Sequence, residues 1–172
     1  AVPILLYLIV GGALVITNRN LDLKISTKDA FIITVLSWML FTILCSVPFI
    51  YTEINLSIVD ALFESMSGVT TTGATVMNNL DQTPKGILIW RAILQWLGGI
   101  GIIVIALVIL PFLRIGGMQL FHLEGDDPYD KFLPKISSVV SKIFIVYADL
   151  TIILFLLYYL NGMSLFDSLA HS

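Results

Sequence analysis

The segment from Ser65 to Thr75, SMSGVTTTGAT, holds the residues of this chain whose types and spacing best suit cation binding. Small hydroxyl residues and glycines follow one another there, so the backbone offers consecutive carbonyl oxygens with little side-chain bulk. Rings of backbone carbonyls replace the water shell of a dehydrated alkali cation in selectivity filters. The segment Thr70 to Thr75 therefore predicts either a filter loop or, more simply, a polar extracellular loop.

The elements that must position this segment are membrane helices. The composition is 58% hydrophobic and only 12% charged, with a mean hydropathy of +0.97, which is typical of a membrane protein. Charge-free segments cover 1–18, 30–52 and 92–113, and a fourth covers 143–161 with one acid, Asp149. Each approaches or exceeds the roughly 20 residues that a helix needs to cross a bilayer. We expect four spanning helices, the first of them clipped.

The basic residues indicate how these helices are oriented. Seven of the nine lie in the connectors between spans one and two and between spans three and four, which places those connectors in the cytoplasm. The segment between spans two and three then faces outward, and with it the residues that could bind a cation. The seven are Arg19, Lys24, Lys28, Arg114, Lys131, Lys135 and Lys142, against Lys85 and Arg91 on the other side.

A short helix is expected just before the hydroxyl-rich segment. Ser57 followed by Asp60 is a capping-box pattern, and Gly68 is a natural stop. A helix of roughly eleven residues is too short to cross a bilayer, so it must enter and return. Irregular backbone is tolerated at membrane depth only where it is buried in protein or lines a water-filled path. The fold class is therefore an all-α integral membrane protein, in which transmembrane helices flank a re-entrant pore helix and filter loop.

The same pattern returns 107 residues later, where SLFDSLAHS at 164–172 lies over SIVDALFES at 57–65. Both copies follow an outward-ending span, which predicts a repeat of span, short helix, loop and span. The expected parts are an extra N-terminal transmembrane helix with its cytoplasmic linker over 1–28, a first complete pore repeat over 29–116, a cytoplasmic loop over 117–133, and the start of a second pore repeat over 134–172, truncated in its pore helix.

Several stretches together resemble a known family. FESMSGVTTTGATV, WRAILQWLGGIGIIVIALVILP, GGMQLF, LPKI and GMSLFDSLAHS are similar to the Trk family of bacterial potassium uptake proteins, whose membrane subunits are the TrkH and TrkG proteins of the Trk/Ktr/HKT superfamily. Members of that family fold as four such repeats, often after two extra helices. The resemblance implies that this chain is an N-terminal or internal fragment of such a protein.

The resemblance also implies a function and its residues. It implies potassium translocation through a filter with one key glycine per repeat, which falls here on Gly73. Thr70, Thr71, Thr72 and Ala74 would supply neighbouring carbonyls, with potassium bound through Thr71, Thr72 and Gly73. Potassium is then the substrate, and no covalent cofactor is expected.

The resemblance further implies partners and a location. A cytoplasmic nucleotide-binding regulatory ring similar to TrkA is expected to dock on the inner face, where the connector from Arg114 to Lys135 mixes charged and apolar residues. We also expect a homodimer, contact with membrane lipid, and a multi-pass location in a bacterial-type inner (plasma) membrane.

Other functions are less compatible with the residues. A sodium or other monovalent cation transporter of the same fold is the first alternative, and a non-conducting structural subunit or an intramembrane enzyme is the second. His122 and His171 fall on opposite sides of the expected topology and cannot share a metal or a catalytic triad, so the chain is not expected to be an enzyme. Nucleic acid is not an expected partner, because no basic cluster is interleaved with aromatic residues.

Two features stay open at this level. Glu64, on the short helix, could tune the cation path or could accept backbone hydrogen bonds behind the filter. Gly98, Gly99 and Gly101, in the third span, could form a hinge or could let helices pack closely.

Overall fold

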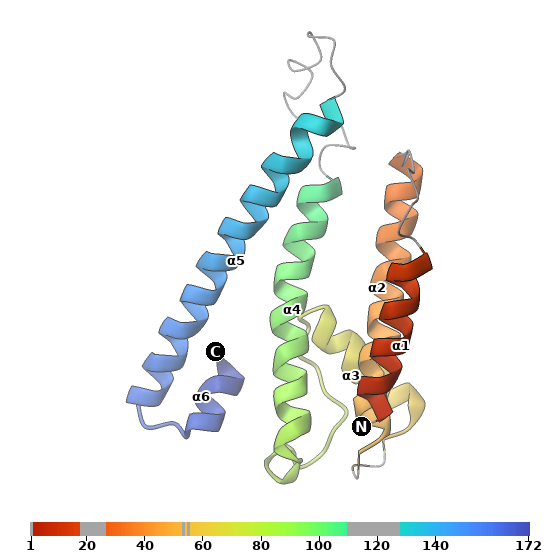
Figure 1. Ribbon diagram of the computed structural model, residues 1–172. Coiled ribbons are helices and arrows are strands. Elements are labelled where there is room, and N and C mark those ends of the chain that lie inside the picture. The colour runs from red at the N-terminus through yellow and green to blue at the C-terminus, as the bar shows by residue number, and fades with distance from the viewer. Residues whose placement is uncertain (1, 18–26, 53, 55, 110–127) are drawn as a thin grey trace. The chain divides into compact units, whose positions relative to one another are not determined.

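The computed structural model describes residues 2–17, 27–52, 54, 56–109 and 128–172, which form helices joined by loops (Figure 1). No strand occurs in these ranges, which confirms the all-α class. The chain divides into two units, Ala1–Ile87 and Leu88–Ser172. The elements are α1 (Val2–Thr17), α2 (Thr27–Ile50), α3 (Ile58–Val69), a 3-10 turn (Leu80–Gln82), α4 (Lys85–Ile109), α5 (Pro128–Leu160) and α6 (Leu165–His171).

Three of the described helices are long and apolar enough to cross a membrane, over Phe31–Ile50, Lys85–Leu107 and Ser138–Leu160. They correspond to the second, third and fourth expected spans. The first expected span forms α1, whose 16 residues extend about 24 Å and fall short of a bilayer core of about 30 Å. The third span begins at Lys85, earlier than its charge-free segment, because the helix accommodates Lys85 and Arg91 in its first turns.

Helix α5 begins at Pro128, inside the segment 117–133 that was expected to be a cytoplasmic loop. Residues 128–133 are therefore helical, and Pro128 stands at the first helical position, where its missing N–H costs no hydrogen bond. The remainder of that loop, 117–127, lies outside the described residues, as do Arg19 and Lys24 in the first basic connector.

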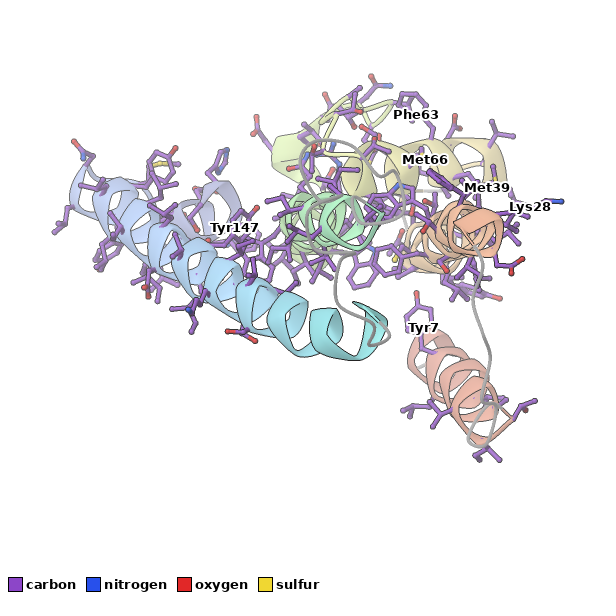
Figure 2. All side chains as sticks on the ribbon, turned by 90° about the horizontal axis from the view of Figure 1, so that it is seen from above. Tyr7, Lys28, Met39, Phe63, Met66 and Tyr147 are labelled. Carbon is purple, nitrogen blue, oxygen red and sulfur yellow. The ribbon has the colours of Figure 1, made fainter. Side chains whose placement is uncertain are left out.

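A hydrogen bond connects α1 to α2 at a carbonyl that a proline leaves without its helical donor. Pro48 has no backbone N–H, so the carbonyl of Leu44, four residues earlier in α2, lacks its helical donor. The hydroxyl of Tyr7 donates to this carbonyl over 2.9 Å. Figure 2 shows Tyr7 projecting from α1 toward α2. Because lipid offers no hydrogen bonds, a partner from within the protein stabilises the carbonyl.

The two short helices begin in the same way. The Ser57 hydroxyl accepts the N–H of Asp60 over 3.1 Å and donates to its carboxylate over 2.7 Å. Ser164 and Asp167 make the same two bonds over 3.1 and 2.6 Å. The predicted caps are confirmed. In a capping box the acidic side chain accepts the backbone N–H of the cap residue, whereas here each carboxylate accepts from the serine hydroxyl. Helix α3 runs one residue past the predicted stop at Gly68 and ends at Val69.

Helix α3 runs back alongside α2, and α6 runs back along α5 (Figure 1). The buried Ser65 hydroxyl donates to the carbonyl of Thr42 over 2.7 Å, and the Thr42 hydroxyl contacts the sulfur of Met66 at 3.8 Å. Figure 2 shows Met66 on the side of α3 that faces α2, with Phe63 pointing away. Thr42 lies eight residues before the end of α2, so the C-terminal end of α3 reaches about 12 Å along that helix. The short helix therefore folds back along α2, and its re-entry into a membrane stays a prediction.

In the second unit, an aromatic cluster holds α5 against α4. The indole N–H of Trp96 donates to the Thr151 hydroxyl over 2.9 Å, and its ring contacts the rings of Phe144 and Tyr147. A Cβ built on Gly99 would lie 2.7 Å from the Tyr147 hydroxyl. Figure 2 shows Tyr147 on the side of α5 that faces α4. At Gly99, close helix packing therefore accounts for the glycine without a hinge.

Candidate functional site

The loop after α3 starts with a helix ending that turns the backbone back on itself. Thr70 is the C-cap, the N–H of Thr71 donates to the Gly68 carbonyl over 3.0 Å, and the N–H of Thr72 donates to the Ser67 carbonyl over 2.9 Å. These two bonds define the Schellman motif, which requires a left-handed residue just after the cap. That residue is Thr71, with φ of +56°. The motif satisfies carbonyls at the end of α3 that would otherwise lack donors.

A threonine in this position is strained. A left-handed backbone brings Cβ close to the following carbonyl oxygen and costs about 1–2 kcal/mol, and a β-branched residue there is a genuine outlier. Helix α5 ends in the same motif, with Gly162 donating to Tyr159 over 3.1 Å and Met163 donating to Tyr158 over 3.2 Å, and there the left-handed residue is Gly162 itself. The chain thus uses glycine at the end of α5 and retains the strain in the hydroxyl-rich loop.

Gly73 is the second left-handed residue of the loop, with φ of +76°, whereas Thr72 between the two has no positive φ. Glycine takes this conformation at little steric cost, and a side chain there would be strained. Its N–H donates to the Ser67 carbonyl over 3.3 Å. When left-handed residues alternate with residues of negative φ, successive peptide N–H groups turn toward one side of the chain, where they converge. Here they converge on the last turns of α3.

The opposite sides of the same peptide groups carry the carbonyls. The peptides are trans, so each carbonyl points away from the N–H of the following residue. Because the N–H groups of residues 71–73 face α3, the carbonyls of Thr70, Thr71 and Thr72 point away from it, on the exposed side of the loop. The carbonyl of Ala74 accepts the Ser67 hydroxyl over 2.6 Å and so points back toward α3. The structure therefore brings three of the expected carbonyls to one side and turns that of Ala74 to the other.

Glu64 holds the far end of the loop. One oxygen of its carboxylate accepts the Thr75 hydroxyl over 2.5 Å, the N–H of Val76 over 2.6 Å and the N–H of Met77 over 3.3 Å. The side chain of Glu64 is 0% exposed, and no buried side-chain oxygen or nitrogen in the described ranges lacks a hydrogen-bond partner. Of the two roles left open for Glu64, these contacts support hydrogen bonding behind the loop.

Sequence reasoning overlooked the part played by Ser67. Its carbonyl accepts from Thr72 and Gly73, and its hydroxyl donates to Ala74, so it contacts much of the loop. The available signal was spacing, since positions 64, 67 and 68 share one face of a helix and all three are buried. The Thr70 hydroxyl donates to the carbonyl of Met66 over 2.8 Å and lies 2.9 Å from the Thr72 hydroxyl.

The electrostatics of the site favour a cation. The C-terminal end of a helix carries about half a negative charge, and this loop lies at the C-terminal end of α3. The buried Glu64 carboxyl lies behind the loop, and the three outward carbonyls present the negative ends of their dipoles on its exposed side. A cation with a removable water shell is the ligand that such an arrangement suits.

Comparison with known proteins finds a family of cation transport proteins, which agrees with a site that favours a cation. The sequence profile of the TrkH family, described as cation transport protein, matches residues 3–172. The chain is 42% identical over 157 residues to the Trk system potassium uptake protein TrkI of Halomonas elongata, covering 91% of this chain and 32% of that protein. It is 38% identical over 173 residues to TrkG of Escherichia coli, covering 99% and 36%, and 44% identical over 158 residues to TrkH of Vibrio parahaemolyticus, covering 90% and 33%. The chain spans about a third of the length of these relatives.

Proposed function

This chain belongs to the TrkH family of cation transport proteins, and from that premise we propose that the complete protein moves potassium across a membrane through a carbonyl-lined filter. It acts as a transporter and catalyses no covalent chemistry. The relatives described above are named potassium uptake proteins. The loop Thr70 to Ala74 contributes one part of the filter, with Gly73 as its key glycine.

The observation that carries this proposal is the shared direction of three successive carbonyls. Left-handed backbone at Thr71 and Gly73 turns the N–H groups of the loop toward α3 and leaves the carbonyls of Thr70, Thr71 and Thr72 on the exposed side. Carbonyl oxygens in this arrangement replace the hydration water of potassium. Potassium is bound through the backbone of residues 70–73, and the Ala74 carbonyl, bonded to Ser67, supports the loop.

One loop supplies ligands on one side of an ion only. Several such loops must converge on a common axis to surround it, and the second helix pair, α5 and α6, with the same cap at Ser164, begins another copy of the unit. The complete protein therefore assembles its filter from repeats of which this chain holds the first in full.

The test is ion uptake by the complete protein in cells that lack other potassium uptake systems. We expect growth at low external potassium and uptake of potassium in preference to sodium. The control is the same cells carrying an empty vector, with the membrane level of the protein verified. Uptake no greater than that of the control would contradict potassium transport, and uptake of sodium in preference to potassium would support the alternative, a sodium transporter of the same fold.

We also propose that the protein lies in a bacterial-type inner membrane as a homodimer, with its basic connectors in the cytoplasm and a TrkA-like nucleotide-binding ring bound there. The basic residues at the start of α5, Lys131 and Lys135, support this side assignment, while residues 114–127 of the connector lie outside the described ranges. Co-elution of the purified complete protein with the ring in the presence of nucleotide is expected. Separate elution under every nucleotide condition would contradict the partnership.

A further inference from the structure

We infer that Glu64 is a positioning residue for ion selection, which fixes the far end of the filter loop through hydrogen bonds and does not itself contact the ion. This inference rests on the proposed function and deepens it, because it assigns a role in selectivity to a side chain behind the filter. The same carboxyl could also have acted by its charge on the ion. The contacts of the loop separate the two possibilities.

Both ends of the loop are attached to α3. Ser67 holds the near end, with its carbonyl accepting from Thr72 and Gly73 and its hydroxyl donating to Ala74. Glu64, one turn earlier on the same face of the helix, holds Thr75 and the two residues after it. The loop is therefore held by hydrogen bonds to two residues, Glu64 and Ser67, that lie one turn apart on α3.

The donors at the far end of the loop share Glu64 as an acceptor. The N–H groups of Val76 and Met77 donate to its carboxyl oxygen, and Met77 is 5% exposed. The N–H of Met77 also lies 3.1 Å from the Thr75 hydroxyl, which itself donates to Glu64. Buried backbone donors within a membrane protein require a partner from the protein. Loss of the Glu64 oxygen would remove an acceptor from the Thr75 hydroxyl and from the N–H groups of Val76 and Met77, of which the last also donates to Thr75.

The far end of the loop affects ion selection through the carbonyls that lie before it. The carbonyls of Thr70, Thr71 and Thr72 keep their direction because the backbone on either side of them is held. The balance between potassium and sodium depends on the positions and dipoles of such carbonyls. If the far end is released, the path of the loop loosens, and discrimination between the two ions should fall even where total uptake persists.

The experiment compares Glu64→Gln with Glu64→Leu in the complete protein. Glutamine keeps an oxygen at the same distance along the side chain but removes the charge, whereas leucine keeps the approximate size and removes the acceptor. Half-saturation concentrations and maximal rates for potassium and sodium uptake are measured at matched membrane levels. Val59→Ala, on the first turn of α3 where the side chain is 74% exposed, is the control and should transport as the unchanged protein does.

We expect Glu64→Leu to lower the preference for potassium over sodium by about tenfold, and Glu64→Gln to stay within about threefold of the unchanged protein, since hydrogen bonds to such groups carry effects of this size. Unchanged selectivity in Glu64→Leu would overturn the inference. Equal loss in Glu64→Gln and Glu64→Leu would also overturn it, because the charge and not the hydrogen bonds would then be responsible.

A second variant covers the case in which Glu64→Leu does not reach the membrane. Thr75→Val has nearly the same shape and removes only the hydroxyl that donates to Glu64. It should lower selectivity in part, because it removes one of the three hydrogen bonds that Glu64 accepts from the far end of the loop. Selectivity unchanged by Thr75→Val would count against the inference. Absence of potassium uptake by the unchanged protein would instead contradict the proposed function, so the two failures are distinguishable.

Discussion

Thr71 and Gly162 occupy the same left-handed position in the same helix-ending motif, although one is β-branched and the other has no side chain. At the end of α5 the glycine meets the conformational demand without steric cost. At the end of α3 the same left-handed backbone is taken by a threonine, whose Cβ makes it strained, in the loop whose carbonyls face outward. Backbone strain that persists in a folded protein is often found at sites of function.

This relationship predicts opposite responses to substitution. Thr71→Gly should raise the free energy of unfolding by up to about 1 kcal/mol, because the relief of strain exceeds the added entropy of the unfolded chain. Gly162→Thr should lower it by about 1–2 kcal/mol. Equilibrium unfolding of the complete protein in mixed detergent micelles measures both. A destabilising Thr71→Gly together with a neutral Gly162→Thr would contradict the shared motif.

Tyr7→Phe should destabilise the contact between α1 and α2. Pro48 removes the helical donor of the Leu44 carbonyl, and the substitution also removes the hydrogen bond from Tyr7 to this carbonyl. The expected loss in unfolding free energy is about 0.5–1.5 kcal/mol, as is usual for hydrogen bonds between membrane helices. Tyr51→Phe, at a side chain that is 66% exposed, is the control. If the two changes lowered the free energy of unfolding equally, the hydrogen bond of Tyr7 would make no specific contribution to stability.

Gly99→Ala should destabilise the packing of α5 on α4 despite the better helix propensity of alanine. Its Cβ would lie 2.7 Å from the Tyr147 hydroxyl, so the tyrosine ring must shift within its contacts to Trp96. We expect a loss of about 1–2 kcal/mol, the usual cost of overpacking. Adding Tyr147→Phe should restore part of it. Gly86→Ala, with nothing within 4 Å of its Cβ, should be neutral or stabilising, and an equal loss there would refute the steric explanation.

Ser57→Ala and Ser164→Ala should have matching effects, because the two serines cap their helices with the same pair of hydrogen bonds. Removal of a helix cap costs about 1 kcal/mol. Unfolding in mixed micelles should show losses of similar size for each, and Ser57→Asn, which keeps a capping oxygen, should show little loss. A large loss at one serine and none at the other would argue against equivalent repeats.

The sequence was sufficient for the elements that depend on local chemistry or on apolar length. The caps at Ser57 and Ser164 and the three long spans follow from residue type and spacing. The left-handed Thr71 did not follow, because threonine disfavours that conformation and the hydrogen bonds to the end of α3, the helix that it follows, impose it. The sequence left two roles open for Glu64, and the repeat did not decide between them, since the second copy holds His171 at the matching position.

Part of the site depends on how the loop folds back, which spacing alone does not specify. The five residues expected to offer carbonyls lie together, but the carbonyl of Ala74 faces Ser67 because a serine hydroxyl lies within reach. Such side-chain to backbone bonds depend on the path of the chain after the helix, and that path is set by contacts between residues seven to thirteen positions apart. Periodicity within an element carries no information about them.

The central claim is that the backbone around Gly73 selects potassium, and Gly73→Ser in the complete protein tests it most directly. A side chain at φ of +76° is strained, and its Cβ would disturb a loop that must approach its counterparts closely. Potassium and sodium uptake are measured in cells without other potassium systems, at matched membrane levels, with Val76→Ala as a nearby side-chain control that keeps its backbone N–H. Reduced potassium uptake or a reduced preference over sodium in Gly73→Ser, with little change in Val76→Ala, is the predicted result. Unchanged rate and selectivity in Gly73→Ser would contradict the assignment of this loop as the filter.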